Sequence, residues 1–431
     1  MKKLFFSAGE PSGDVHGANL IQALRELDPT VQCVGFGGPR MKEAGLDPLF
    51  DLTTLAVMWV SEVLKQLRKF FALADQAEEM FRTDPPDAVI LIDYPGFNWH
   101  IAKRAKRHGI PVFYYSPPQI WAWKQGRVKK MRRLIDHVFS GLPFETDWLA
   151  KHGVSVEYVG HPFFDEVRNY PRSSETLERL RGLKPLVGLL PGSRTGEVQR
   201  NFPVFWNAVR KIQRERPDVH FAVAAFRDEH AAWIRDFLEN QDEKLPNIEV
   251  LTRQTPEIIQ TADCCLSVSG SVSLELLHHA VPAVISYRVG RVGWWLQYWF
   301  RRVRFITLVN LLTLENPFRR PNPEFRPGSD DARTAIFPEY LTFRDRSDWI
   351  AADLLRWLQD PSARDECAAR LAALREQIGQ PGAARKTAEK ILAALGTPQV
   401  QRTRKPAAQG APQTAIGPAD QADGADLGGW D

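Results

Sequence analysis

The sequence predicts an α/β protein with two doubly wound domains, each built on a parallel sheet. Short apolar runs alternate with helix-like segments through most of the chain, which is the pattern of parallel strands joined by helical crossovers. The alternation stops at a polar stretch, residues 168–184, and then restarts. Near the start of each half, an apolar run ends in a loop rich in Gly, Ser and Pro that precedes a helix-like segment. We therefore expect two domains facing a cleft.

The first half, residues 1–167, contains six apolar runs of strand length. They cover residues 4–7, 31–36, 88–93, 112–115, 137–140 and 156–159. Between the first two runs, Leu20, Ile21, Leu24 and Leu27 recur at helical spacing. We expect an N-terminal Rossmann-like domain here, followed by a linker over residues 168–184.

The second half repeats the pattern over residues 185–345. Strands are expected at residues 186–190, 221–225, 248–251, 264–268 and 283–286, with helices at 198–214 and 273–279. Residues 346–395 read as helices, and we expect them to pack back on the N-terminal domain. Residues 396–431 hold almost no large apolar side chains and are expected to be disordered.

Composition narrows the class of protein. The chain has 431 residues, 44% of them hydrophobic, and a net charge of +4, which excludes a strongly basic nucleic-acid binder. The four cysteines, Cys33, Cys264, Cys265 and Cys367, lack metal-site spacing and suit a reducing cytosol. We expect no metal and no cofactor. The initial apolar run is too short for an export signal, and no apolar stretch is long enough to span a membrane.

Two loops at the ends of expected strands resemble anion sites. The first contains Gly9, Glu10, Ser12, Gly13 and Asp14, and the second contains Gly192, Ser193 and Arg194. A small-residue loop that leads into a helix presents backbone N–H groups and the positive end of the helix dipole. The alternative is that the glycines only close tight βα turns.

Asp93 follows the apolar run at residues 88–92. A carboxylate at the carboxyl end of a parallel strand is well placed to act as a general base. The alternative is that Asp93 caps the following helix.

Three features of the second half fit a nucleotide sugar. Arg194 can hold a diphosphate without a metal, unless it only pairs with Glu197. A similar strand–loop–helix pattern recurs at Ser269, Gly270 and Ser271, and Glu275 further along can accept hydrogen bonds from ribose hydroxyls. An N-capped helix with an acidic first turn explains that loop and Glu275 equally well.

Two aromatic segments remain. Trp121 and Trp123 lie in a proline-rich loop that starts at Ser116, and they read as a cleft wall or as core packing. The second segment contains Trp294, Trp295, Trp299, Arg301 and Arg302, and its mixture of aromatic and basic side chains is typical of an interfacial helix on an anionic membrane surface. A buried aromatic helix with a basic edge is the competing interpretation.

Six motifs follow one another along the chain. They are Gly9-Glu10-Pro11-Ser12-Gly13-Asp14, Ile92-Asp93-Tyr94-Pro95-Gly96-Phe97-Asn98, Ser116-Pro117-Pro118-Gln119-Ile120-Trp121-Ala122-Trp123, Leu142-Pro143-Phe144-Glu145, Gly160-His161-Pro162 and Leu190-Pro191-Gly192-Ser193-Arg194. In order and spacing they resemble the lipid-A-disaccharide synthase family over residues 4–312, and more loosely over 337–395.

The resemblance implies an inverting glycosyltransferase of GT-B architecture. It implies transfer from UDP-2,3-diacylglucosamine to the 6-hydroxyl of 2,3-diacylglucosamine 1-phosphate, with release of UDP. Asp93 matches the general base, Arg194 a residue at the donor diphosphate, and Glu275 the ribose-binding position. Asn310 lies in a further family motif and is expected at the donor. Gly9, Glu10, Ser12, Gly13, Asp14, Asn98, Ser116, Trp121 and Trp123 are then expected on the acceptor side.

The sequence departs from the family pattern in the second half. Val309 stands where a proline is usual, residues 313–335 look like an insertion, and Thr342 replaces a glutamine. Other interpretations are a different GT-B enzyme, such as a MurG-like transferase or a UDP-GlcNAc 2-epimerase, and a non-catalytic nucleotide-sugar binder at a membrane. Lipid substrates place the expected enzyme on the cytoplasmic face of the inner membrane, either as a monomer or as a homodimer.

Overall fold

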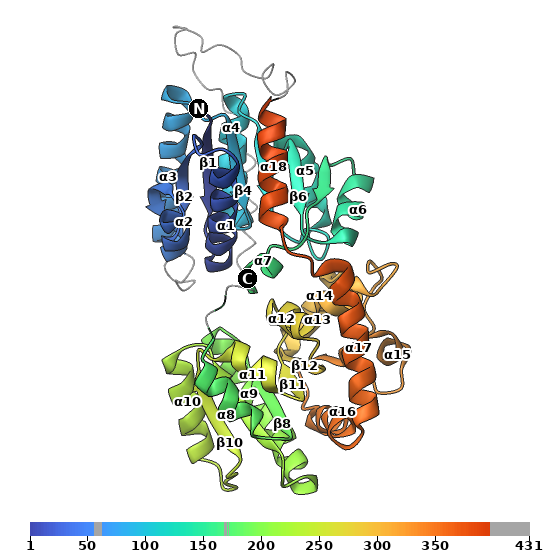
Figure 1. Cartoon of the computed structure of the whole chain (residues 1–431). Helices are drawn as coiled ribbons and strands as arrows, with labels where there is room; N and C mark the ends of the chain where they lie inside the picture. Colours follow the sequence, from blue (N-terminus) through green and yellow to red (C-terminus); the bar gives the residue numbers. More distant parts are fainter. Residues whose placement is uncertain (56–62, 168–169, 171, 397–431) are drawn as a thin grey trace. The chain divides into compact units, whose positions relative to one another are not determined.

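The computed structural model describes residues 1–55, 63–167, 170 and 172–396, and these residues form two compact units (Figure 1). Unit 1 comprises residues 1–120, 124–166 and the segment from 381 onward, and unit 2 comprises residues 121–123 and 167–380. The tail that the sequence predicts to be disordered, residues 396–431, lies outside the described residues apart from Gly396, which ends the last helix.

Unit 1 is built on a seven-stranded parallel sheet with strand order β3-β2-β1-β4-β5-β6-β7. The strands are β1 (Lys3–Ala8), β2 (Gln32–Gly37), β3 (Leu46–Asp51), β4 (Ala88–Ile92), β5 (Val112–Tyr115), β6 (His137–Ser140) and β7 (Val156–Tyr158). The helices are α1 (Pro11–Leu27), α2 (Pro39–Glu43), α3 (Val63–Thr83), α4 (Pro95–Arg107), α5 (Val128–Leu134), α6 (Pro143–Lys151), α7 (Phe163–Glu166) and α18 (Ala383–Gly396). Short 3-10 turns cover Leu52–Leu55 and Gln125–Arg127.

Helix α18 belongs to unit 1 although it is the last element of the chain. It lies beside α1 (Figure 1), and its buried residues Ala384, Ala388 and Ile391 join the same core cluster as Leu20 and Leu24 of α1. Asp165 fixes its start by accepting hydrogen bonds from the backbone N–H groups of Gly382 and Ala384. Helix α1 therefore packs against a helix that is distant in sequence.

Unit 2 is built on a six-stranded parallel sheet with strand order β10-β9-β8-β11-β12-β13. The strands are β8 (Leu186–Leu190), β9 (His220–Ala225), β10 (Ile248–Thr252), β11 (Cys264–Ser267), β12 (Ala283–Arg288) and β13 (Glu339–Thr342). The helices are α8 (Ser174–Arg181), α9 (Thr195–Glu215), α10 (Asp228–Glu239), α11 (Thr255–Thr261), α12 (Val272–His279), α13 (Arg291–Phe300), α14 (Leu308–Leu312), α15 (Asp330–Thr334), α16 (Ser347–Gln359) and α17 (Pro361–Ile378).

The structure differs from the expected packing of residues 346–395. Helices α16 and α17 remain in unit 2, where α16 packs on α9 and α17 packs on α12, and only α18 joins unit 1. The buried apolar faces explain this, since Leu354 and Trp357 of α16 and Leu371 of α17 lie in the core of unit 2.

Candidate functional site

Asp93 and Tyr94 follow the carboxyl end of β4 in a backbone conformation that is rare for residues with a side chain. Their φ angles are +42° and +46°, in the left-handed region. Strained residues of this kind are typical of functional sites. Tyr94 is the N-cap of α4 and no side chain caps that helix, so the alternative role of Asp93 as a helix cap is not what the structure contains.

The strained turn is held in place by Asn98, which is fully buried. The Asn98 amide nitrogen donates to the carbonyl of Asp93 at 2.7 Å, and its amide oxygen accepts from the Ser7 hydroxyl at 2.6 Å. The Tyr114 hydroxyl also donates to the carbonyl of Asp93, at 2.6 Å. The expectation that Asn98 contacts the acceptor is therefore wrong: its amide is used to join the ends of β1 and β4.

Asp93 has a raised pKa. Burial and the nearby negative charge of Glu10 raise the pKa of Asp93 from 3.8 to about 6, with burial the larger cause. A carboxylate of this basicity is ionised at neutral pH and accepts a proton more readily than an exposed aspartate. Ser116 lies next to it, because the Ser116 carbonyl accepts from the Asp93 N–H at 3.3 Å.

The loop before α1 packs against Tyr94 through Gly9 and carries a negative charge at Glu10. A Cβ atom on Gly9 would lie 2.4 Å from the Tyr94 ring, so only glycine lets the ring pack there. Glu10 is partly buried and Ser12 is exposed beyond it, while Gly13 is buried. The Glu10 charge, which raises the pKa of both Asp93 and Tyr94, disfavours a bound anion at this loop.

Asp14 is buried and does not line a substrate surface. Its carboxylate accepts hydrogen bonds from the backbone N–H groups of Gly38, Arg40 and Met41, at 2.8 to 3.0 Å. It therefore caps the start of α2 and fixes the turn after β2. Asp14 is expected on the acceptor side from the sequence, but its carboxylate is used to hold the backbone at the start of α2.

In unit 2, the loop after β8 has the geometry expected of an anion site. Gly192 has a φ of +123°, and a Cβ there would lie 2.9 Å from Glu197, so the turn requires glycine. Ser193 is exposed, and Arg194 is the N-cap of the 21-residue helix α9, which no side chain caps. The first N–H groups of α9 thus lack a side-chain acceptor from the capping residue.

Arg194 forms the ion pair with Glu197 that was the alternative interpretation. The distance is 3.7 Å and the Arg194 side chain is 78% exposed. An exposed pair of this kind contributes less than about 1 kcal/mol, so it does not prevent the guanidinium from binding a ligand. The ion pair is therefore present, and the diphosphate role of Arg194 stays a prediction.

The loop after β11 lies next to the loop after β8. The two strands are neighbours in the sheet, with Ser267 opposite Leu190, and the Val268 N–H donates to the Leu190 carbonyl. Gly270 and Ser271 are exposed, and a Cβ atom on Gly270 would point into open space. Ser269 is occupied within the fold, because its hydroxyl donates to the carbonyl of Ile306 at 3.0 Å.

Two other expected donor residues are buried. Glu275 is only 6% exposed on the first turn of α12. Asn310 has no exposed surface: its amide oxygen accepts from the N–H groups of Ile336 and Phe337, and its nitrogen donates to Phe337 and Glu339. Asn310 cannot contact a donor in this arrangement, so that expectation is wrong. Its amide instead hydrogen-bonds to the backbone of Ile336 and Phe337, just before β13.

The two tryptophans of the proline-rich loop have different surroundings. Trp121 is 1% exposed and packs edge-on against Phe318, with ring centroids 6.3 Å apart. Both residues belong to unit 2, so Trp121 is core packing and not an acceptor wall. Trp123 is 42% exposed and remains available as a surface residue.

Helix α13 has two chemically distinct faces. Its outward face forms an apolar stripe of exposed side chains flanked by Arg302 and Arg320. The stripe comprises Val292, Trp295, Leu296, Trp299 and Phe300, which are 52% to 74% exposed. Trp295, Trp299 and Arg302 are therefore exposed, and their contact with a membrane stays a prediction.

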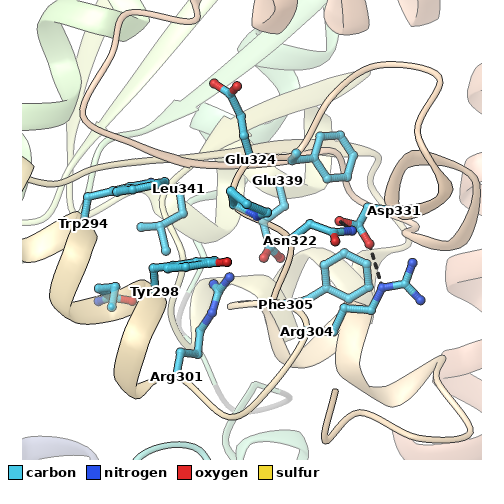
Figure 2. Close-up of a pocket in the computed structure, with 13 residues that line it drawn as sticks. Trp294, Tyr298, Arg301, Arg304, Phe305, Asn322, Glu324, Asp331, Glu339 and Leu341 are labelled. Carbon is cyan, nitrogen blue, oxygen red and sulfur yellow. Dashed lines mark hydrogen bonds and ion pairs between the residues drawn. The ribbon is translucent and has the colours of Figure 1, made fainter. Parts of the chain in front are cut away.

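Trp294 and Arg301, which the sequence predicts at the membrane surface, lie instead on the inward face of α13. Trp294 stacks on Tyr298 with the ring planes 4° apart, and Arg301 is only 8% exposed. Figure 2 shows both side chains directed into a polar pocket together with Tyr298. Neither residue can lie against a bilayer, because the helix turns them away from the apolar stripe.

This pocket includes residues that the sequence interpretation did not single out. Glu339 from β13 lines it, as do Tyr298 from α13 and Asn322 and Asp331 from the 313–335 segment (Figure 2). The spacing 294, 298 and 301 is that of one helical face, and this signal in the sequence separates the inward residues from the outward ones. Among the described residues no cluster of three or more His, Cys, Asp or Glu side chains could hold a metal ion.

Two parallel-sheet units with loops at the carboxyl ends of their strands define the class of protein as GT-B. Solved structures with this fold include a MnaA–UDP complex from S. aureus, with a TM-score of 0.61, 14% identity, and coverage of 92% of this chain and 97% of that one. Another is the UDP-GlcNAc 2-epimerase of Neisseria meningitidis bound to UDP-GlcNAc, with a TM-score of 0.58, 12% identity, and coverage of 91% and 100%. At these identities the likeness concerns the fold alone.

The sequence relatives narrow the class further. A family model described as lipid-A-disaccharide synthetase matches residues 4–335. The lipid-A-disaccharide synthase of Geobacter sulfurreducens is 34% identical over 91% of this chain and 97% of its own length. That of Trichlorobacter lovleyi is 36% identical over 91% and 97%. The chain belongs to the lipid-A-disaccharide synthase family, and the resemblance seen in its motifs is confirmed.

Within the described ranges, no helix combines the length and the apolar character needed to cross a bilayer.

Proposed function

We propose that this enzyme transfers the sugar of UDP-2,3-diacylglucosamine to the 6-hydroxyl of 2,3-diacylglucosamine 1-phosphate. The products are a β-1,6-linked disaccharide 1-phosphate and UDP. The observation that carries the proposal is Asp93: a partly buried carboxylate with a pKa of about 6, held on a strained turn by Asn98 and Tyr114. The relatives named above give the reaction class.

In the proposed mechanism Asp93 acts as the general base. It accepts the proton of the acceptor 6-hydroxyl as that oxygen forms a bond to C1 of the donor sugar. The bond from C1 to the diphosphate oxygen breaks on the opposite face, and UDP leaves with its electron pair. A single displacement of this kind inverts the configuration at C1.

The donor diphosphate is proposed to bind at the loop after β8. Its negative charge increases as the C1–O bond breaks, so a guanidinium and helix N–H groups bind the transition state more tightly than the ground state. Arg194 and the start of α9 supply these donors, and the exposed loop at Gly270 and Ser271 lies on the neighbouring strand.

The apolar stripe of α13 is proposed to contact an anionic membrane surface from the cytoplasmic side. Both proposed substrates carry acyl chains and reside in a bilayer. The stripe exposes two tryptophans at 55% and 63%, and Arg302 and Arg320 flank it, which combines apolar insertion with attraction to anionic lipids.

Mass spectrometry of the products tests the reaction directly. The protein is incubated with both acylated glucosamine substrates and assayed for disaccharide 1-phosphate and UDP. Asp93→Asn is expected to abolish turnover and to leave UDP binding largely unchanged. Asp75→Asn, which neutralises an exposed aspartate of the same unit, is the matched control. Near-normal turnover of the Asp93 variant would reject the assignment of the base.

Arg194 is tested by substitution with alanine. The expected loss in kcat/KM is roughly a hundredfold, since one donor to a developing negative charge is worth about 2–4 kcal/mol. Arg200→Ala removes an exposed arginine from the same helix and should leave the rate unchanged. A rate within twofold of the parent for Arg194→Ala would exclude the residue from the donor site.

A further inference from the structure

A small polar cavity lies in unit 2 on the inward face of α13. Residues from α13, from the start of β13 and from the 313–335 segment line it (Figure 2). Its volume is about 30 Å³. Since about 10–15 Å³ on this measure holds one water molecule, the cavity has room for one compact polar group.

Arg301 is a charged side chain of the cavity lining whose hydrogen-bond donors are not all used, and Arg304 and three carboxylates line the cavity beside it. It is 8% exposed, and two of its guanidinium nitrogens, Nε and Nη1, are buried without a hydrogen-bond partner in the described part of the chain. A buried donor on a charged group is costly to leave unpaired. Burial also lowers the pKa of Arg301, although Glu339 and Asp331 oppose that change.

Three carboxylates line the cavity, and each has its hydrogen bonds or ion pairs with groups other than Arg301. Glu324 pairs with Arg326 and Arg346. Glu339 accepts from the Ile306 N–H, from the N–H and hydroxyl of Thr307, and from the Asn310 amide. Asp331 accepts from Arg304 at 2.6 Å and from Asn322 at 2.7 Å. Glu339 and Asp331 interact with the charge of Arg301, but they do not accept hydrogen bonds from its Nε and Nη1.

Two neutral side chains of α13 complete the polar lining beside Arg301. The amide oxygen of Gln297 is buried without a partner among the described residues, and turning the amide over would present its N–H₂ group in the same place. The Tyr298 hydroxyl points into the cavity beside the Arg301 guanidinium (Figure 2). A guanidinium, an amide and a hydroxyl that converge on a compact space form a donor set suited to a tetrahedral oxyanion.

We propose that this cavity binds a single phosphate group, with Arg301 as its main ligand and Gln297 and Tyr298 as supporting donors. The group belongs either to a soluble phosphate ester or to a lipid headgroup. The second source is compatible with the apolar stripe on the opposite face of the same helix. The site is separate from the loop after β8 and does not depend on the proposed reaction.

Calorimetric titration tests the proposal, with inorganic phosphate and a soluble short-chain phosphatidylglycerol as the two probes. The titrations are made in an Arg194→Ala background, so that the guanidinium of the loop after β8 does not contribute. Arg301→Met is expected to weaken binding at least tenfold, and Tyr298→Phe about threefold. Arg302→Gln, which removes the neighbouring exposed arginine, should change phosphate binding less than twofold.

Each outcome decides the proposal. Binding of inorganic phosphate that Arg301→Met and Tyr298→Phe leave unchanged would overturn it, as would the absence of saturable binding of both probes. Tyr298→Phe keeps the ring stacked on Trp294, so it remains informative if Arg301→Met fails to fold. If both variants weaken binding, the proposal stands. A short-chain lipid that binds ten times more tightly than phosphate then identifies the lipid source, and equal affinities identify the soluble source.

Discussion

Replacing Glu10 with glutamine should make the enzyme more active at acidic pH. The charge of Glu10 raises the pKa of Asp93, so its removal lets Asp93 ionise at a lower pH. Burial is the larger cause and is retained in the variant. The pKa of Asp93 should therefore fall but stay above its ordinary value of 3.8.

The size of the effect follows from the two causes. The pKa of Asp93 lies about two pH units above its ordinary value, at about 6 against 3.8, and Glu10 is the smaller of the two causes that raise it. The acid limb of kcat/KM, which reports the free enzyme, should move down by less than about one pH unit. At pH 5.5 this corresponds to a rise in kcat/KM of roughly two- to threefold relative to the alkaline plateau.

The assay is a pH profile of kcat/KM between pH 5 and 9, with each variant normalised to its own plateau. Normalisation separates a change in the pKa of Asp93 from any loss of acceptor contacts at Glu10. Glu26→Gln is the control, because Glu26 lies near the far end of α1, about 24 Å along the axis from Glu10, and pairs with Arg385 at the surface. An acid limb that does not move, or that moves upward, would refute the role of Glu10.

Three further results are expected. Asp93→Asn should stabilise the protein at pH 8 by up to about 3 kcal/mol in urea unfolding: the raised pKa makes ionisation costly above pH 6, and the gain should vanish as the pH falls toward 3.8. Asp14→Ala should cost at least about 2 kcal/mol in the same assay, since three backbone N–H groups lose their acceptor; an unchanged midpoint would contradict the cap. Trp295→Ser and Trp299→Ser should each weaken binding to anionic vesicles at least tenfold in sedimentation, whereas Tyr158→Ser should not; equal losses for all three would argue against the stripe.

Most of the fold was predictable because its central strands are continuous apolar runs. The strands β5, β6 and β8 begin and end where the sequence predicts. The two strands that were not predicted, β3 and β13, are both at the edges of their sheets. Pro48 interrupts β3, and edge strands tolerate such breaks because one side of the strand needs no partner.

The polar residues of the candidate site were harder to predict, for a different reason. Composition and motif place Asp93 and Arg194 at strand ends, and strand ends are where parallel sheets present side chains. Asn98 of α4 and Asn310 of α14 also lie in motifs, yet both are buried and hydrogen-bond to backbone groups. The hydrogen-bond partners of these side chains are distant in sequence. A motif therefore does not reveal whether a polar side chain contacts a ligand or the main chain.

The position of α18 has a consequence for how the protein is made. Unit 1 requires a helix that the ribosome synthesises only after all of unit 2, residues 167–380. Until then α1 lacks the part of its packing that α18 provides. The surface of unit 1 on which α18 packs therefore stays uncovered until unit 2 has been synthesised. Apolar surface that is exposed during synthesis favours aggregation, so we expect unit 1 to be most prone to aggregate before α18 is made.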